Sequence, residues 1–272
     1  MTQTDIIDIT FDLETADTAV TAAPLQLAAV AWLRNAELSY QTGGRRDPFL
    51  RQKDIYNDNE NENENGEALV AYSRHCDLTA AWMDGLTVSS DTQQWWSRQK
   101  DEVRRAVTGD PRSRLTPEEL WQTFFAWTEA VRERTGARHL VLWCQGQDFD
   151  IAMMRYQAHR YGLRLPVSQY SLRDCRTLAL ELALLFDRTP HADAPSRTPR
   201  PLTPDELFSA PSREPYRHLP PLPATALAAA APFAAADTLQ PHEPLYDALR
   251  SSWSTWHAIQ ELRLMVMEPI KF

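Results

Sequence analysis

The stretch Ile6–Glu14 reads Ile-Ile-Asp-Ile-Thr-Phe-Asp-Leu-Glu, a short apolar run that ends in two carboxylates. Its β-branched and aromatic residues are typical of a buried strand. Asp12 and Glu14 are two residues apart, so their side chains point to the same face of that strand. Adjacent acids at the end of a core strand repel each other and resist burial. A magnesium or manganese ion between them would remove both penalties. The alternative is a strand that runs out into solvent with two hydrated acids.

The composition fits one α/β domain. The chain has 272 residues, of which 43% are hydrophobic, enough for one large domain with insertions. The first residues carry no signal-peptide pattern, and the longest non-polar stretch, 224–236, is alanine-rich and interrupted by Pro232. Three cysteines without metal-ligand spacing are typical of reduced thiols. We therefore expect a cytoplasmic protein that does not span a membrane.

The formal net charge of −9 argues against a broad basic surface for nucleic acid. Part of this charge is local, because residues 54–67 hold six acids and no lysine or arginine. The remaining body is only mildly acidic. It can still bind the end of a strand through metal ions and a few arginines.

Hydrophobic patterns predict alternating strands and helices in a single domain that covers residues 1–272. The predicted strands are 6–14, 24–33, 37–40, 68–74 and 139–144, and the second is expected to be antiparallel to the first. The predicted helices are 91–99 with Asp91 as N-cap, 116–134 with Thr116 as cap, 151–161, 173–186 and 244–267.

Two segments interrupt this pattern. Residues 43–67 are polar, acidic and of low complexity, and we expect a solvated loop there. Residues 188–241 form a Pro/Ala-rich arm, since twelve of the nineteen prolines lie between Pro190 and Pro241. Such a segment is not expected to form a regular helix or a central strand, apart from one short helical attempt at 204–209. We expect the arm to contribute little to the core.

Further acids follow the first pair at two later elements. Asp150 lies where a strand turns into a helix, and Asp247 lies near the start of the last helix. If that helix begins near Pro244, Asp247 is on its first turn and His242 is in the loop before it. Both residues can then lean over the end of the first strand.

Three motifs in this order resemble the DEDDh 3′–5′ exonucleases of the ribonuclease H-like superfamily. They are Phe11–Thr15, Trp143–Asp150 and the pair His242 and Asp247 followed by alanine. Asp91–Gln99 and Arg173–Leu178 are similar to one branch, the exodeoxyribonuclease VIII-like and mycobacterial 3′–5′ exoribonuclease-like proteins. The resemblance covers about residues 5–185 and 241–262.

The second motif departs from the family pattern. Cys144 and Gln145 stand where relatives usually have glycine and asparagine. Asp148 competes with Asp150 for the role of metal ligand. We favour Asp150, because it directly follows Phe149 as in the family and lies where the helix starts. The arm is also longer than the family needs.

The resemblance implies a ribonuclease H-like mixed β-sheet flanked by helices, with the Pro-rich insertion before the C-terminal helix. It implies a hydrolase that cleaves phosphodiester bonds from the 3′ ends of single-stranded DNA or RNA. Two Mg²⁺ or Mn²⁺ ions would be held by the four carboxylates Asp12, Glu14, Asp150 and Asp247, and His242 would act as general base. A catalytically silent end-binding or scaffold subunit is the alternative. Dimers are common among similar exonucleases, which leaves a homodimer open.

Three further residues are candidates for substrate binding. Trp95 and Trp96 cannot both face one side of a helix, so one is expected to pack in the core and the other to lie at a surface. Trp96 is the candidate for stacking on a nucleobase, against plain packing. Arg173 and Arg176 are candidates for phosphate contacts, against a salt bridge that involves Asp174.

Overall fold

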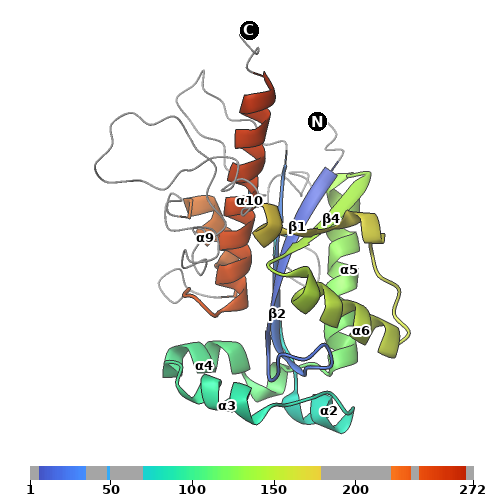
Figure 1. Ribbon diagram of the computed structural model, residues 1–272, viewed down its shortest axis with the longest axis vertical. Helices are drawn as coiled ribbons and strands as arrows, with labels where there is room; N and C mark the ends of the chain where they lie inside the picture. Colours follow the sequence, from blue (N-terminus) through green and yellow to red (C-terminus); the bar gives the residue numbers. More distant parts are fainter. Residues whose placement is uncertain (1–5, 35–47, 50–69, 179–221, 234–238, 268–272) are drawn as a thin grey trace, which may run out of the picture.

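The computed structural model describes residues 6–34, 48–49, 70–178, 222–233 and 239–267 (Figure 1). Its five strands form one mixed sheet in the order β3-β2-β1-β4-β5. They span β1 Ile6–Thr15, β2 Pro24–Trp32, β3 Ala71–His75, β4 His139–Cys144 and β5 Leu172–Asp174. β1 pairs with β2 in antiparallel and with β4 in parallel orientation. The predicted fold, a mixed sheet flanked by helices, is confirmed, and so is the antiparallel second strand.

Helices occupy both faces and one end of this sheet (Figure 1). They are α2 Leu78–Met83, α3 Ser90–Ser97, α4 Asp101–Thr108, α5 Pro117–Thr135, α6 Ala152–Arg160, α9 Ala224–Ala230 and α10 Pro244–Met267. Shorter turns are η2 Pro111–Ser113, η3 Gln147–Ile151 and η4 Gln169–Ser171. The helix predicted from 173 starts later, because Arg173 and Asp174 pair with β4 as part of β5. Residues 175–178 are helical, and the rest of the predicted helix lies outside the described residues.

Two apolar cores lie on opposite faces of the sheet. The first packs the odd-numbered residues of β1, among them Ile9 and Phe11, against Phe124 of α5 and neighbouring side chains of α6. The second packs Trp32 of β2 against Trp256 and other residues of α10. Because side chains alternate along a strand, the even-numbered residues of β1 face α10.

The boundaries of two helices test the capping arguments. Thr116 and Glu119 form the capping box of α5, which ends at Gly136 in a left-handed conformation, close to the predicted bounds. The N-cap of α3 is Ser89, whose side chain accepts from Thr92 N–H, so the prediction of Asp91 is wrong. Asp91 lies in the first turn instead, where a negative charge also suits the helix dipole.

Part of the predicted arm is helical. α9 lies between Pro223 and Pro232, and Ala226 and Ala230 are fully buried in the second core. The expectation that no regular helix forms there is wrong for this run, because it contains no proline. The expectation that the arm contributes little to the core is wrong for the same run, because one face of α9 packs into the second core.

Within the predicted loop 43–67, Pro48 and Phe49 are described and buried: Leu33 N–H donates to the Pro48 carbonyl at 2.7 Å, and the Phe49 ring stacks on Trp253 in the second core. The prediction of a solvated loop is therefore wrong for these two residues, because the large apolar ring of Phe49 is buried against the second core. The other residues of that loop, residues 37–40 and the short helix predicted at 204–209 lie outside the described residues.

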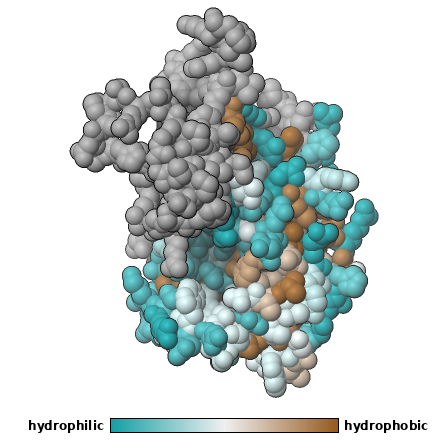
Figure 2. Space-filling view, viewed as in Figure 1, coloured by the Kyte–Doolittle hydropathy of each residue, from teal (hydrophilic) through white to brown (hydrophobic). Residues whose placement is uncertain are grey.

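Hydrophobic residues on the face shown in Figure 2 form separate patches among hydrophilic ones. Within the described ranges, no helix has the length and apolar character needed to cross a membrane.

Candidate active site

The face of β1 that looks toward α10 begins with Ile6 and then carries four polar residues: Asp8, Thr10, Asp12 and Glu14. The first two polar residues are fully buried and have partners. Trp143 Nε1 donates to Asp8 Oδ1 at 2.7 Å, and Trp32 Nε1 donates to Thr10 Oγ1 at 3.0 Å. Asp12 and Glu14 follow on the same face, at the end of the strand.

The neighbouring strand stops before β1 does. β4 pairs with β1 only as far as Thr10, and then turns at Gly146 into the π-helical η3. Gly146 has φ of 141°, a conformation that favours glycine, and its carbonyl accepts from Phe149 and Asp150 N–H at 3.2 Å each. The turn buries Asp150 to 3% exposure and leaves Asp148 exposed. The structure thus gives the inward position to the aspartate that the sequence favoured.

The N-terminal end of α10 supplies the remaining predicted residues. Asp247 lies in the first turn, and its Oδ2 accepts from the backbone N–H of His242 at 3.0 Å. His242 has φ of 68°, which is uncommon for a non-glycine residue. One ligand atom each of Glu14, His242 and Asp247 lies within 4.8 Å of the others. The spacing of five residues in the third motif therefore places the imidazole beside the carboxylates.

All four carboxylates have a raised pKa, and for Asp12 and Glu14 the charges of other acids in this group contribute to the rise. Burial is the largest cause for each, and it raises the pKa of Asp150 and Asp247 to about 7. For Asp12, the charges of the other three acids add to burial and raise its pKa well above the ordinary value. Hydrogen bonds from backbone N–H groups, including that of Leu13, limit the rise for Asp150. Four such acids cannot all ionise at neutral pH without a counter-charge.

A fifth carboxylate, Glu243, adds to this charge. It is 6% exposed, and its Oε2 has no hydrogen-bond partner among the described residues. Burial raises the pKa of Glu243, and its charge contributes to the raised pKa of Asp247. Sequence reasoning missed Glu243, because a glutamate in a loop before proline is ordinarily hydrated. Its position directly after His242 was the available signal.

The donor set fits a hard divalent cation. Carboxylate oxygens with a nearby imidazole nitrogen are ligands that magnesium and manganese accept. The raised pKa values support the same conclusion, since a cation would let the half-buried Asp12 and Glu14 ionise. Asp12, Glu14, Asp150 and Asp247 are the residues that would hold it.

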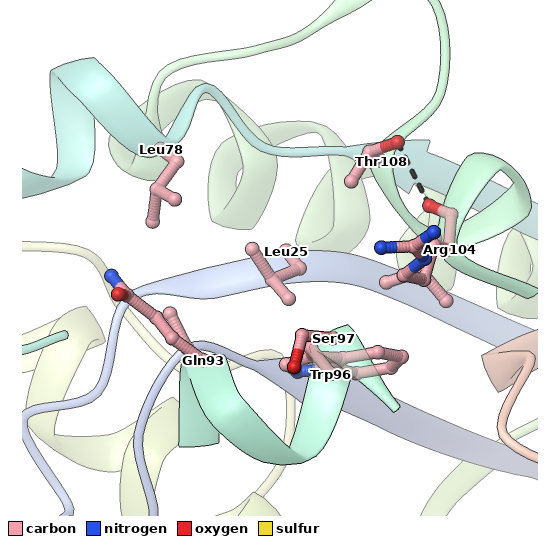
Figure 3. Close-up of a pocket in the computed structure, with 9 residues that line it drawn as sticks. Leu25, Leu78, Gln93, Trp96, Ser97, Arg104 and Thr108 are labelled. Carbon is pink, nitrogen blue, oxygen red and sulfur yellow. Dashed lines mark hydrogen bonds between the residues drawn. The ribbon is translucent and has the colours of Figure 1, made fainter. Parts of the chain in front are cut away.

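The two tryptophans of α3 occupy different environments. Trp96, the predicted stacking residue, is half-buried, and its Nε1 donates to the Thr15 carbonyl at 2.9 Å. The exposed ring is that of Trp95. Trp96 also lines a mostly apolar cavity of about 270 Å³ next to the end of β1. Figure 3 shows Leu25 of β2 between Leu78 and Trp96 in this cavity.

The two candidate arginines differ as well. Arg173 Nη1 donates to the carbonyls of Tyr170 and Leu172. Asp174 does not pair with either guanidinium: its carboxylate accepts from Arg176 N–H and from Thr177 Oγ1, both at 2.9 Å. The side chain of Arg176 is exposed beside Gly146, and its charge lowers the pKa of Asp150. Arg176 is therefore the arginine nearer the acids.

Comparisons with known proteins concern the family and the fold. No curated protein matches the sequence. Among solved structures, the fold is similar to that of cell-death related nuclease 4 (CRN-4), with a TM-score of 0.50 and 12% identity over 94% of this chain. The alignment spans 64% of that nuclease, and at this identity it shows a similarity of fold alone. The family model of the 3′–5′ exoribonuclease Rv2179c-like domain matches residues 8–193. The chain therefore belongs to the Rv2179c-like 3′–5′ exoribonuclease family.

Proposed function

We propose that the protein removes nucleotides from the 3′ end of single-stranded nucleic acid with the help of two Mg²⁺ or Mn²⁺ ions. The observation that carries this proposal is the group of four mutually repelling carboxylates at the open end of β1, with His242 beside them. The family description favours RNA as substrate. DNA offers the same 3′ hydroxyl and phosphate, so both belong in the test.

Divalent cations bound to Asp12, Glu14, Asp150 and Asp247 would neutralise phosphate charge and lower the pKa of a water molecule. The protein's own groups complete the chemistry. Burial lowers the pKa of His242, so its imidazole is mostly neutral at pH 7 and can accept a proton from the attacking water. Asp247 fixes the backbone of His242 through the 3.0 Å hydrogen bond. Arg176 offers an exposed guanidinium for a substrate phosphate.

The proximity of His242 to Glu14 and Asp247 allows a second role, that of a metal ligand. Replacement by alanine separates the two roles. If His242 is the base, His242→Ala should lower turnover by roughly 10²–10⁴-fold while the affinity for Mg²⁺ persists. His242→Asn, which keeps a polar group but cannot accept the proton, should be nearly as slow. If turnover falls only because Mg²⁺ no longer binds in a calorimetric titration, His242 is a ligand.

The reaction itself is tested on matched RNA and DNA oligomers labelled at the 5′ end. We expect a ladder of products shortened from the 3′ end with Mg²⁺, and none with EDTA. Products shortened from the 5′ end, or cleavage that persists in EDTA, would contradict the proposal. Binding of the oligomers by the wild-type protein with no cleavage under any divalent cation would support the silent end-binding alternative.

A further inference from the structure

Helix α3 presents two neighbouring indole rings that are connected to β1. Trp96 is tied to the strand by its hydrogen bond to the Thr15 carbonyl, one residue after Glu14. The ring of Trp95 meets that of Trp96 at 4.8 Å between centroids and 82° between planes. Trp95 is thus held by a ring that is itself anchored at the acid-bearing end of β1.

The other neighbour of Trp95 is His242. Their ring centroids are 5.2 Å apart and their planes are at 86°, the edge-to-face geometry that aromatic pairs prefer. Trp95 remains 38% exposed, so this contact is made at the border between the protein and solvent. Sequence reasoning did not foresee it, because nothing local links α3 to the loop before α10.

The imidazole of His242 has few other restraints. Its backbone is fixed by the left-handed φ and by the hydrogen bond to Asp247. Among the described residues no hydrogen bond reaches the ring itself, and Trp95 is its aromatic neighbour. Without Trp95, rotation about the side-chain bonds of an exposed histidine would be limited chiefly by the backbone.

We propose that Trp95 is a positioning residue that keeps the imidazole of His242 turned toward Glu14 and Asp247. This inference rests on the proposed role of His242. The contacts run from Thr15 through Trp96 and Trp95 to His242, and they set the position of the ring relative to the end of β1. A base held in this way is oriented before substrate arrives, which favours proton transfer without adding to substrate affinity.

The test separates turnover from substrate binding. Trp95→Ala should lower kcat by roughly 3- to 10-fold, the worth of one aromatic contact, and leave KM within about twofold. Trp95→Phe keeps an aromatic ring and should recover most of the loss. In a His242→Ala background, Trp95→Ala should cost nothing further, because there is no ring left to orient.

Trp82 provides a matched control. It is an exposed tryptophan on α2, 67% accessible and outside the site, and Trp82→Ala should leave kcat unchanged. Three results would overturn the positioning role: wild-type kcat in Trp95→Ala, a raised KM with unchanged kcat, or the same loss in the His242→Ala background. The raised KM would assign Trp95 to substrate binding instead. Wild-type turnover by His242→Ala alone would overturn the role of His242 first, and the positioning role with it.

Discussion

Asp8 and Asp12 occupy the same face of the same strand, four residues apart, yet their surroundings are opposite. Arg34 donates to both carboxylate oxygens of Asp8, from Nε to Oδ2 at 3.0 Å, and Trp143 adds a third hydrogen bond. Asp12 faces Glu14, Asp150 and Asp247, all acids. Burial raises the pKa of both aspartates, but only for Asp12 do the neighbouring charges add to that rise. Burial alone therefore does not identify a functional carboxylate. A negative charge that its neighbours do not balance does.

β1 has an inner half, Ile6–Thr10, and an outer half, Phe11–Thr15, and the boundary lies where its pairing with β4 ends. Up to Thr10 the strand has neighbours on both edges, and its polar groups are satisfied by side chains of the second core. Beyond Thr10, β4 no longer pairs with β1. On that side, the turn η3 and the first turn of α10 place acids near the strand. The inner half behaves as structure and the outer half as a site.

The largest difference is expected in activity. Asp12→Ala should lower turnover by at least about 10³-fold, because Asp12 faces the three other proposed ligands and the proposed cations would supply several kcal/mol of transition-state stabilisation. The fold should survive, since removing one of four like charges relieves repulsion. Cleavage assays and circular dichroism on the same preparation measure both effects. A well-folded Asp12→Ala protein with normal turnover would refute the metal-site assignment.

The inner half should respond in stability instead. Asp8→Ala leaves the buried Nε1 of Trp143 and the guanidinium of Arg34 without their acceptor, and should cost about 3 kcal/mol of unfolding free energy. The lower end of the usual range applies, because the Arg34 side chain is 23% exposed and can reach water. Asp8→Asn, which retains an acceptor for Trp143, should lose less. Chemical denaturation measures both variants, and a loss of turnover in the folded Asp8→Ala protein beyond about threefold would contradict a purely structural role.

The pH dependence of stability should reveal the acids around the outer half of β1 without any mutation. Asp150 and Asp247 have a pKa of about 7 in the folded protein and about 3.9 when unfolded. The folded form therefore binds protons more tightly, and their contribution is full below about pH 4 and lost as pH rises through 7. In EDTA, the loss of this contribution should lower Tm as pH rises from 5 to 8.

Addition of Mg²⁺ provides the control for that measurement. The cation stabilises the ionised acids, so the difference in Tm between Mg²⁺ and EDTA should grow with pH, by about 2–4 °C for each kcal/mol. Histidines such as His75, whose pKa is lowered by burial, affect both melts equally and cancel in the difference. A difference in Tm that is constant from pH 5 to 8 would mean that these carboxylates do not bind the ion.

Local pattern and the family resemblance together predicted the outer half. The i, i+2 spacing places Asp12 and Glu14 on a common face, whereas the choice of Asp150 over Asp148 rests on the family pattern, in which the aspartate directly follows Phe149, and on the start of the helix. The structure brings these acids together with Asp247, while their roles as ligands stay predictions. Pro244 also marked the start of α10 correctly.

Contacts between distant segments were beyond that reasoning. The partner of Asp8 is Arg34 just after β2, and the partner of His242 is Trp95 on α3. Each pair depends on how elements pack, which propensity and spacing do not encode. Spacing also does not determine which of Trp95 and Trp96 is exposed, since both lie on a short helix without a buried residue to fix its rotation.

The smallest expected effect concerns Thr10, the last satisfied position before the site. Thr10→Val preserves the shape of the side chain but removes the acceptor of the Trp32 indole N–H, with both residues fully buried. An unsatisfied buried donor costs about 1–3 kcal/mol, so thermal denaturation should show a modest loss, while kcat should not change. A double-mutant cycle with Trp32→Phe isolates the hydrogen bond from the packing lost with the larger ring. If Thr10→Val instead lowered kcat tenfold at unchanged stability, the border between structure and site would lie one position further inward, between Asp8 and Thr10.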